Sequence, residues 1–438
     1  MTVTETTTNQ RLLSLDIFRG IAIAGMILVN NPGSWSTVYW PLLHAEWHGV
    51  TPTDWVFPFF LFAVGMAVPL ALGKRRGQPQ GAILGKIGLR SLIIFGLGLL
   101  LAAFPDFKMV DGTPKAVRYA HYGLLSIFVL ALFFRAVALG QKPARARAAR
   151  LALYTVIAAA MAMALVAGPY YDWSLLRIPG VLQRIAIVYA VCALLFLNTT
   201  WRGQAYTAVG LLLGYWALMA LVPVPDGNPP NLEPETNLGA WLDRALLGTN
   251  HLWSQSKTWD PEGLLSTLPA IATGISGMLA THWLRTAKSD HHRLWGLLGA
   301  GLALTLLGSI WGLVFPLNKA LWTSSYVLHS SGVALLFLGG IYWLSDMKGH
   351  QAWAKPFYVY GANALFVFVL SGFVAKLSYS ISWEGEAGSR VTLKQWAYEG
   401  FLGGFSPYNA SLAFALANVL FFLALAWWLY WRRIFIKV

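Results

Sequence analysis

The stretch TDWVFPFFLFAVGMAVPLALG (residues 53–73) carries one charged side chain, Asp54, near its start and none after it. A helix needs about 20 predominantly apolar residues to cross the hydrocarbon core of a bilayer, where every backbone group must be satisfied within the helix. Residues 53–73 reach this length. The sequence therefore predicts a membrane-spanning helix at this position.

The composition extends this interpretation to the whole chain. Hydrophobic residues make up 57% of the 438 residues and charged residues 11%, whereas ordinary globular chains carry about 25% charged residues. The abundant Trp, Tyr and Phe suit the interface between lipid and water. We expect an all-α, polytopic membrane helix bundle in the lipid bilayer, with residues 1–438 forming a single domain.

Apolar runs of the same kind predict twelve spans along the chain. Asp16 and Arg19 interrupt the first span, which makes it the weakest of the twelve. The approximate bounds are 12–30, 53–73, 87–104, 119–139, 151–168, 178–197, 205–223, 263–284, 294–314, 321–344, 357–380 and 409–431.

The distribution of basic residues orients these spans. With the N-terminus in the cytoplasm, most of the 32 Lys and Arg lie at inner ends, in 74–90, 135–150, 285–293 and the C-terminal tail. Basic residues favour the cytoplasmic side of a membrane, so we expect both termini to be cytoplasmic. The net charge of +14 then reflects topology, and no nucleic-acid partner is needed to explain it.

This layout places three longer segments outside, at 31–52, 224–262 and 381–408. Within 224–262, GAWLDRALLG predicts a short helix, and the surrounding Pro, Asn and Asp favour irregular structure. The N-terminus has no basic region before its apolar run, so we expect the first helix to stay in the protein. The single cysteine, Cys192, excludes an intramolecular disulfide and a cysteine-rich metal site, and in the absence of an HExxH pattern we expect no metal.

Ionisable residues inside predicted spans are costly and tend to face the bundle interior or a water-filled path. Asp16 and Arg19 stand three residues apart on one helix face, so they can pair. The pair either fixes helix packing or contacts an anionic ligand that enters from the cytoplasm. Both interpretations remain open.

RIPGVLQR (177–184) opens the sixth predicted span. Arg177 would lie near the outer face, with Gln183 and Arg184 deeper, and Arg184 needs a partner, a water path or a ligand. Asn363 lies near the inner end of the eleventh span. An asparagine in a span more often joins two helices than contacts a ligand.

Polar side chains also gather at the predicted outer face. Helix capping or interface anchoring explains each of them singly, since acidic residues in a first helical turn favour the positive end of the helix dipole. Together they bring a titratable base, amides and carboxylates to one face. They are Asn30, Asn31, His44, Glu46, His48, Asp260 and Glu262.

Five segments, taken in order, resemble the heparan-α-glucosaminide N-acetyltransferase family, and they cover nearly the whole chain. That family includes a lysosomal membrane enzyme and many bacterial relatives, so the resemblance implies a bacterial member, multi-pass in the inner (cytoplasmic) membrane. The segments are RLLSLDIFRGIAIAGMILVN (11–30), HAEWHGVTPTDWVFPFFLFAVG (44–65), RIPGVLQR (177–184), DPEGLLSTL (260–268) and NKALWTSSYVL (318–328).

The resemblance implies an acetyltransferase that moves an acetyl group from cytosolic acetyl-CoA to the amine of a terminal glucosamine on the opposite, periplasmic side. The family's essential histidine matches His44, its asparagine near the reacting acetyl group matches Asn30, and its RIPG arginine matches Arg177. A homodimer is also implied. The sequence departs from the family at His48, where the family has Asn. A two-helix insertion over 105–170 is a further departure.

Another departure lies in the eleventh span, where Ser371 and Gly372 replace a His-Glu pair of the lysosomal enzyme. This change concerns the acceptor more than the acetyl chemistry. The expected acceptor-binding residues are Asp260, Glu262, Trp40, Trp47, Asn31 and Arg177. The expected acetyl-CoA-binding residues are Asp16, Arg19, Lys86, Arg90, Gln183, Arg184 and Asn363.

On this view His44 deprotonates the acceptor amine and Asn30 stabilises the oxyanion. A route through an acetyl-histidine intermediate remains open. Two other functions also remain open. One is an amino-sugar permease, although the chain lacks the repeat symmetry and paired broken helices of many transporters. The other is an O-acyltransferase that acts on envelope polysaccharide, with a hydroxyl acceptor in place of the amine.

Overall fold

The computed structural model describes residues 12–73, 80–140, 145–287, 289–385 and 389–436. They form the expected all-α bundle, with one antiparallel hairpin of β1 (Ser382–Glu384) and β2 (Arg390–Thr392) in which Ser382 pairs with Thr392. The α-helices are α1 (Leu13–Asn30), α2 (Val56–Leu72), α3 (Gln80–Ala103), α4 (Lys115–Gly140), α5 (Ala146–Val166), α6 (Val181–Asn198), α7 (Trp201–Leu221), α8 (Leu238–Leu247), α9 (Thr267–Thr286), α10 (Asp290–Trp311), α11 (Ser324–Tyr342), α12 (Lys355–Ala362), α13 (Ala364–Ser380), α14 (Leu393–Leu402) and α15 (Pro407–Trp431).

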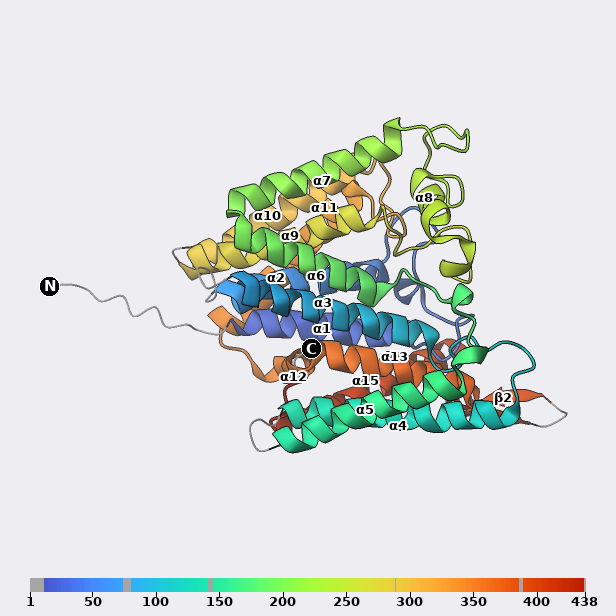
Figure 1. The fold of residues 1–438 in the computed structure, drawn as a ribbon. Helices are drawn as coiled ribbons and strands as arrows, with labels where there is room; N and C mark the ends of the chain where they lie inside the picture. The colour runs from blue at the N-terminus through green and yellow to red at the C-terminus, as the bar shows by residue number, and fades with distance from the viewer. Residues whose placement is uncertain (1–11, 74–79, 141–144, 288, 386–388, 437–438) are drawn as a thin grey trace.

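Short helical turns connect several of these elements. They are η1 (Trp40–Leu42), η2 (Pro52–Trp55), η4 (Gly168–Tyr170), η5 (Trp173–Leu175), η6 (Thr249–His251), η7 (Trp343–Met347) and η8 (Ala352–Ala354). The long helices lie side by side, with α4 and α5 packed against each other at one edge of the bundle (Figure 1). That these two helices are an insertion stays a prediction.

Among the described residues, ten helices are long and apolar enough to cross a membrane, and an eleventh span arises if α12 and α13 are counted together. These two helices are bent by 74° at Asn363, so the expected span 357–380 is broken. The remaining expected span corresponds to α9, which is less apolar than the ten helices. The multi-pass architecture is confirmed.

The position of α9 explains its weaker hydrophobicity. It packs against α2, α6, α7 and α11, and most of its residues are buried by these neighbours. A Cβ atom on Gly277 would come within 2.0 Å of the Phe62 carbonyl oxygen of α2, so glycine permits this close approach. A helix enclosed by other helices meets little lipid and can carry polar residues such as Thr273 and Thr281, which are fully buried.

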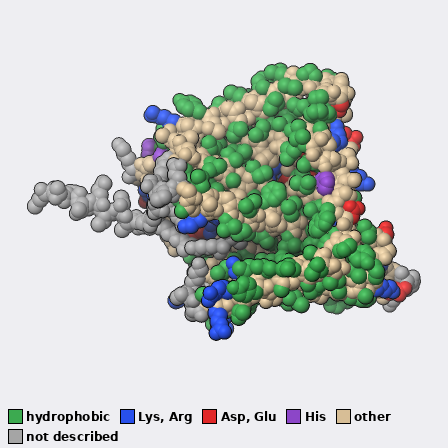
Figure 2. All heavy atoms as spheres, in the orientation of Figure 1, with side chains coloured by type: hydrophobic (Ala, Val, Ile, Leu, Met, Phe, Trp, Pro, Cys, Tyr) green, Lys and Arg blue, Asp and Glu red, His purple; other side chains and the backbone are tan. Residues whose placement is uncertain are grey.

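The two ends of the bundle differ in charge. Figure 2 shows Lys and Arg side chains gathered at the left end, most Asp and Glu at the right end, and an apolar surface between them. The right end also carries α8 and the β-hairpin (Figure 1). The sequence predicts this separation of basic and acidic residues. That the acidic end faces outward remains an inference from the distribution of charge.

The segments predicted as outer loops contain more structure than the sequence indicated. The short helix expected near GAWLDRALLG is present as α8 and is capped by Asn237, whose side chain accepts a hydrogen bond from the Ala240 N–H. The segment 381–408, predicted only as a loop, holds both strands and α14. Thr392 caps α14 by accepting from the Gln395 N–H, which a sequence of mixed polarity did not reveal.

Candidate active site

The loop between α1 and α2 is fixed by a capping box at η2. Asp54 Oδ2 accepts hydrogen bonds from the Thr51 N–H (2.9 Å), the Thr51 hydroxyl (3.1 Å) and the Ala45 N–H (3.1 Å). The Asp54 side chain is only 1% exposed. These donors satisfy one carboxylate oxygen and leave the other, Oδ1, directed at a further partner.

That partner is His44. Its Nδ1 lies 2.7 Å from Asp54 Oδ1, and its side chain is 45% exposed. Since the ionised carboxylate only accepts hydrogen bonds, Nδ1 carries the hydrogen, and in the neutral ring Nε2 is left as the proton acceptor. Asp54 therefore holds His44 in the tautomer that leaves Nε2 able to accept a proton. In the sequence, Asp54 is only the charged residue near the start of the apolar run 53–73, and its position there does not predict a contact with His44.

A second residue that the sequence analysis missed is Lys319, from the loop between α10 and α11. Its Nζ lies 3.0 Å from Nδ1 and 3.1 Å from Nε2 of His44, and 3.8 Å from Asp54 Oδ1. Nearly equal distances place Nζ off the lone-pair axis of Nε2, so the contact is a close polar one rather than a linear hydrogen bond. Burial lowers the pKa of Lys319, while the charges of Asp54 and Glu262 act to raise it.

The loop that carries Lys319 is itself well fixed. The buried Asn318 accepts a hydrogen bond from the Leu321 N–H at 2.8 Å, and its own N–H donates to the Thr323 hydroxyl at 3.1 Å. Asn318 Nδ2 also lies 3.3 Å from His48 Nδ1. His48 thus connects two loops, and it is His44 that contacts both Asp54 and Lys319. The motif NKALWTSSYVL contained the signal for Lys319, but nothing in its spacing pointed to His44.

Three predicted acceptor-binding residues come together in the structure. Arg177 donates from Nε and Nη2 to Asp260 (2.9 and 2.6 Å) and from Nη2 to Glu262 (2.7 Å). Burial acts to lower the pKa of Arg177, but the two carboxylates raise it above its usual value. The charges of Asp260 and Glu262 also act on Arg184, and that of Glu262 acts on Lys319, so two further cations lie near this cluster.

Arg184 lies on α6 and is 1% exposed. Its Nη2 donates to the Gly263 carbonyl oxygen (3.2 Å) and to the Ser266 hydroxyl, and its guanidinium lies over the Trp322 ring, 5.0 Å from the centroid. Its Nε and Nη1 find no partner among the described residues. The described residues therefore bind only one of the three guanidinium nitrogens of Arg184. The other two, Nε and Nη1, remain available to a ligand or water.

The predicted aromatic residues differ in their surroundings. Trp47 donates from Nε1 to the Leu232 carbonyl oxygen at 2.9 Å, and its ring meets Trp259 edge-on at 5.0 Å. Trp259 in turn contacts Trp253, with centroids 5.5 Å apart. Trp40 is 66% exposed in η1. The outer end therefore offers a tryptophan cluster around Trp47 and a separate exposed ring.

The two asparagines that end α1 also differ. Asn31 donates from Nδ2 to the Ile27 carbonyl oxygen at 2.8 Å and so caps the helix. Asn30 is exposed, and within the described part of the chain its side chain makes no hydrogen bond. Asn30 therefore keeps both its donor and its acceptor available.

The residues expected to bind acetyl-CoA occupy several depths. Arg19 Nη2 donates to Asp16 Oδ1 at 2.9 Å and to the Gly361 carbonyl oxygen, as the pairing prediction required. Arg90 lies over the Tyr189 ring at 4.6 Å, and its Nε is buried with no partner among the described residues. Lys86 is exposed on α3.

Gln183 and Asn363 complete this set. Gln183 is buried on α6, and its side chain lies where a Cβ atom on Gly98 of α3 would clash. Asn363 donates from Nδ2 to the Ile434 carbonyl oxygen (3.0 Å) and accepts from the Ile436 N–H (2.7 Å). Asn363 thus holds the segment after α15 with both ends of its amide, which is the role of joining two segments that the sequence analysis favoured.

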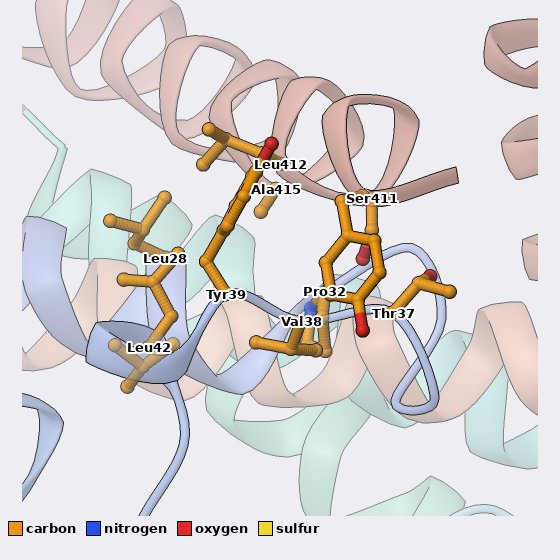
Figure 3. Close-up of a pocket in the computed structure, with 11 residues that line it drawn as sticks. Leu28, Pro32, Thr37, Val38, Tyr39, Leu42, Ser411, Leu412 and Ala415 are labelled. Carbon is orange, nitrogen blue, oxygen red and sulfur yellow. The ribbon is translucent and has the colours of Figure 1, made fainter. Parts of the chain in front are cut away.

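An apolar pocket lies beside this site and anchors the same loop (Figure 3). Leu28, Pro32 and Tyr39 face Ser411, Leu412 and Ala415 of α15 across it. The Tyr39 hydroxyl donates to Asn409 Oδ1 at 2.7 Å, so the loop is tied to α15. Its lining is mainly apolar and does not include His44. We therefore interpret the pocket as part of the packing between the loop and α15.

Comparisons with known proteins identify the same family that the five sequence segments resemble. Residues 11–113 match a family model described as "Heparan-alpha-glucosaminide N-acetyltransferase, catalytic". The human heparan-alpha-glucosaminide N-acetyltransferase is 27% identical over 416 residues, which covers 82% of this chain and 52% of the human protein. The mouse protein of that name is 26% identical over 413 residues, with 82% and 53% covered. The chain spans about half the length of these relatives, and its resemblance to the heparan-α-glucosaminide N-acetyltransferase family is confirmed.

Proposed function

We propose that this chain is a transmembrane N-acetyltransferase that transfers the acetyl group of acetyl-CoA to the amine of glucosamine or a terminal glucosaminide. The acceptor would bind at the outer, periplasmic end, in the inner membrane of a bacterium. The observation that carries the proposal is the His44–Asp54 pair, whose imidazole lies within 3.1 Å of a primary amine, that of Lys319. The site thus already accommodates the chemical group that the acceptor would present.

The acceptor amine is an ammonium at neutral pH and must lose a proton before it attacks a thioester. An imidazole has a reference pKa of about 6.5, which suits a general base near neutral pH. Asp54 holds Nδ1–H and would stabilise the imidazolium that forms when Nε2 takes the proton. Asn30, with a free side-chain amide, would donate to the oxygen that becomes negative as the amine adds.

The outer cluster has the properties that a cationic sugar requires. The carboxylates of Asp260 and Glu262 beside Arg177 offer hydrogen-bond acceptors to an ammonium, and the exposed ring of Trp40 suits the face of a sugar. In this proposal Trp40 and Trp47 contact the ring, and Asn31 lies at the edge of the same end. Testing hydroxyl acceptors beside amines distinguishes this function from an O-acyltransferase.

The donor would bind through the bundle from the basic inner end. Among the described residues, buried N–H groups without a partner lie along this route and fit an oxygen-rich ligand: Nε of Arg90 and, nearer the outer cluster, Nε and Nη1 of Arg184. Arg90 contacts Tyr189, and Tyr189 lies five residues from Arg184 on α6, about 7 Å along the helix. Unpaired N–H groups thus recur along the α3–α6 interface, a path suited to an extended acyl carrier. Lys86, Arg19 with Asp16, and Gln183 are assigned to the same donor region, whereas Asn363 holds the segment after α15.

The direct experiment uses purified protein in detergent with labelled acetyl-CoA and glucosamine. His44→Ala should lower kcat by a factor on the order of 10² to 10⁴, the usual contribution of a general base. His48→Ala is the matched control and should retain most of the activity. Loss of activity in His48→Ala with retention in His44→Ala would overturn the assignment of the base.

A single-turnover experiment without acceptor separates two routes. In Lys319→Arg, which has no amine beside His44, direct transfer predicts no CoA release before the sugar is added, whereas an acetyl-histidine intermediate predicts one stoichiometric burst. Uptake of labelled glucosamine in the absence of acetyl-CoA would instead favour a permease. A homodimer remains part of the proposal, and light scattering of the purified protein tests it.

A further inference from the structure

We propose that Lys319 is itself an acetyl acceptor, so that in the absence of an amino sugar the protein acetylates its own Lys319 Nζ. This inference rests on the proposed function, which supplies acetyl-CoA as the donor. It adds a modification site on the chain, with acetyl as the group transferred. It also explains why a lysine amine occupies the position where an acceptor amine is needed.

The Lys319 amine lies beside the same side chains that the proposed mechanism places beside the amine of the sugar. Its Nζ lies 3.0 Å from Nδ1 and 3.1 Å from Nε2 of His44 and 3.8 Å from the Asp54 carboxylate, so the amine is within reach of Nε2 although it lies off the lone-pair axis. These are the groups that the proposed mechanism uses to take a proton from a sugar amine. Lysine and an amino sugar both present an unhindered primary amine, so a base that activates one also activates the other.

The surroundings of Lys319 also favour the reactive, neutral amine. Its side chain is 22% exposed, and burial lowers its pKa. A partly desolvated lysine is an activated nucleophile in this way. Because Asp54 and Glu262 oppose the shift, His44 is still needed to remove the proton efficiently.

Three other lysines at this end make no such contacts with the described residues. Lys394 donates to the Tyr379 hydroxyl at 2.6 Å and lies over its ring. Lys376 donates to backbone carbonyl oxygens at the end of α3, among them Phe104 at 3.1 Å. Lys257 is exposed in the outer segment between α8 and α9. It serves as the control for uncatalysed acetylation.

The reaction balances without any further reactant. His44 takes one proton from the Lys319 ammonium, and the free amine adds to the thioester carbonyl carbon. The carbon–sulfur bond then breaks, CoA leaves as the thiol with the second amine proton, and an N-acetyl-lysine amide remains. His44 returns its proton to water.

The product has consequences for the site. An amide is stable, so acetylated Lys319 is a modified state rather than an intermediate. The modification removes a positive charge beside Asp54 and adds bulk next to His44. Incubation with acetyl-CoA alone should therefore slow later acetylation of glucosamine, and glucosamine present from the start should protect the protein.

The test uses the full-length protein in detergent, incubated with acetyl-CoA with or without glucosamine, followed by peptide mass spectrometry. We expect an acetyl group on Lys319 at an occupancy at least about tenfold above Lys257, and suppression of that signal by glucosamine. In His44→Ala the rate of Lys319 acetylation should fall on the order of 100-fold. Lys319→Arg, which cannot be acetylated, should lose the slow inhibition that acetyl-CoA alone causes.

The outcomes separate this inference from the proposed function. If glucosamine is acetylated while Lys319 stays unmodified, the inference is wrong and the function stands. If Lys319 is acetylated and glucosamine is not, the inference stands and the acceptor is wrong. Equal acetylation of Lys319 and Lys257 that is insensitive to His44→Ala would show uncatalysed chemistry and overturn the inference. Absence of both products overturns both proposals.

Discussion

Asp54→Asn tests the base most sharply, because the structure dictates how the new amide must turn. Three donors, from Ala45 and Thr51, converge on Oδ2 of Asp54. The amide oxygen of the variant must take that place, so its NH₂ group faces His44 Nδ1, 2.7 Å away in the native site. An NH₂ group can only donate, so Nδ1 must lose its hydrogen and Nε2 must gain it.

The size of the effect follows from that change of tautomer. Nε2 would carry a hydrogen in the neutral ring and could no longer accept a proton from the acceptor amine. In a Ser-His-Asp triad the same substitution lowers kcat about 10⁴-fold, and general-base catalysis contributes about 10² to 10⁴. We expect kcat for glucosamine acetylation to fall within that range, about 3 to 5 kcal/mol in activation free energy.

The assay is steady-state transfer from labelled acetyl-CoA, with thermal unfolding in detergent as a check on the fold. Thr51→Val is the control, since it removes a hydroxyl that contacts Asp54 Oδ2 (3.1 Å) and the Leu43 carbonyl oxygen (2.6 Å) but keeps both side chains of the His44–Asp54 contact. It should cost less than about tenfold in kcat. A folded Asp54→Asn protein that keeps more than a tenth of the native kcat would refute the role given to this pair.

Three further predictions concern buried polar groups. Arg177→Gln leaves Asp260, which is 0% exposed, without its cation and should lower the free energy of unfolding by about 3 kcal/mol, measured by thermal unfolding; an unchanged midpoint contradicts it. Burial raises the pKa of Asp243 to about 7 in the folded protein, so its contribution to stability is complete below pH 3.8 and is lost as the pH rises through about 7. Asp243→Asn should therefore flatten the melting temperature between pH 5 and 8, and an unchanged slope counts against the shift. Asn363→Leu should release the segment after α15, detected as faster proteolysis there, with KM for acetyl-CoA nearly unchanged; a large rise in KM would favour the donor-binding role instead.

The fold was largely predictable because the length of the apolar runs in the sequence determines where the membrane-spanning helices form. Apolar runs of sufficient length located the helices, and α9 was found although the groups it buries make it less apolar than its neighbours. The bend at Asn363 was not predicted, because a 74° break depends on packing and leaves no proline or glycine as a signal at that residue. The strands within 381–408 were also not predicted, since a strand of three residues is too short to show a reliable periodicity in the sequence.

The site was harder to predict because its members meet only in three dimensions. His44 and Lys319 are 275 residues apart, and Arg177 and Asp260 are 83 apart. Neither spacing has a local signature. Asp54 lies near His44 in sequence, yet an acidic residue at a helix start is explained by capping alone. The sequence therefore did not predict the contact of Asp54 with His44.

Transfer across a sealed membrane tests the central claim most directly. The protein is reconstituted into vesicles that enclose glucosamine, labelled acetyl-CoA is added outside only, and the label on the enclosed sugar is measured for the native protein and for His44→Ala. The proposal predicts that N-acetylated sugar accumulates inside vesicles of the native protein and falls on the order of 100-fold with His44→Ala. Label that never appears on the enclosed sugar, or that appears equally with both proteins, would contradict transmembrane acetyl transfer by this histidine.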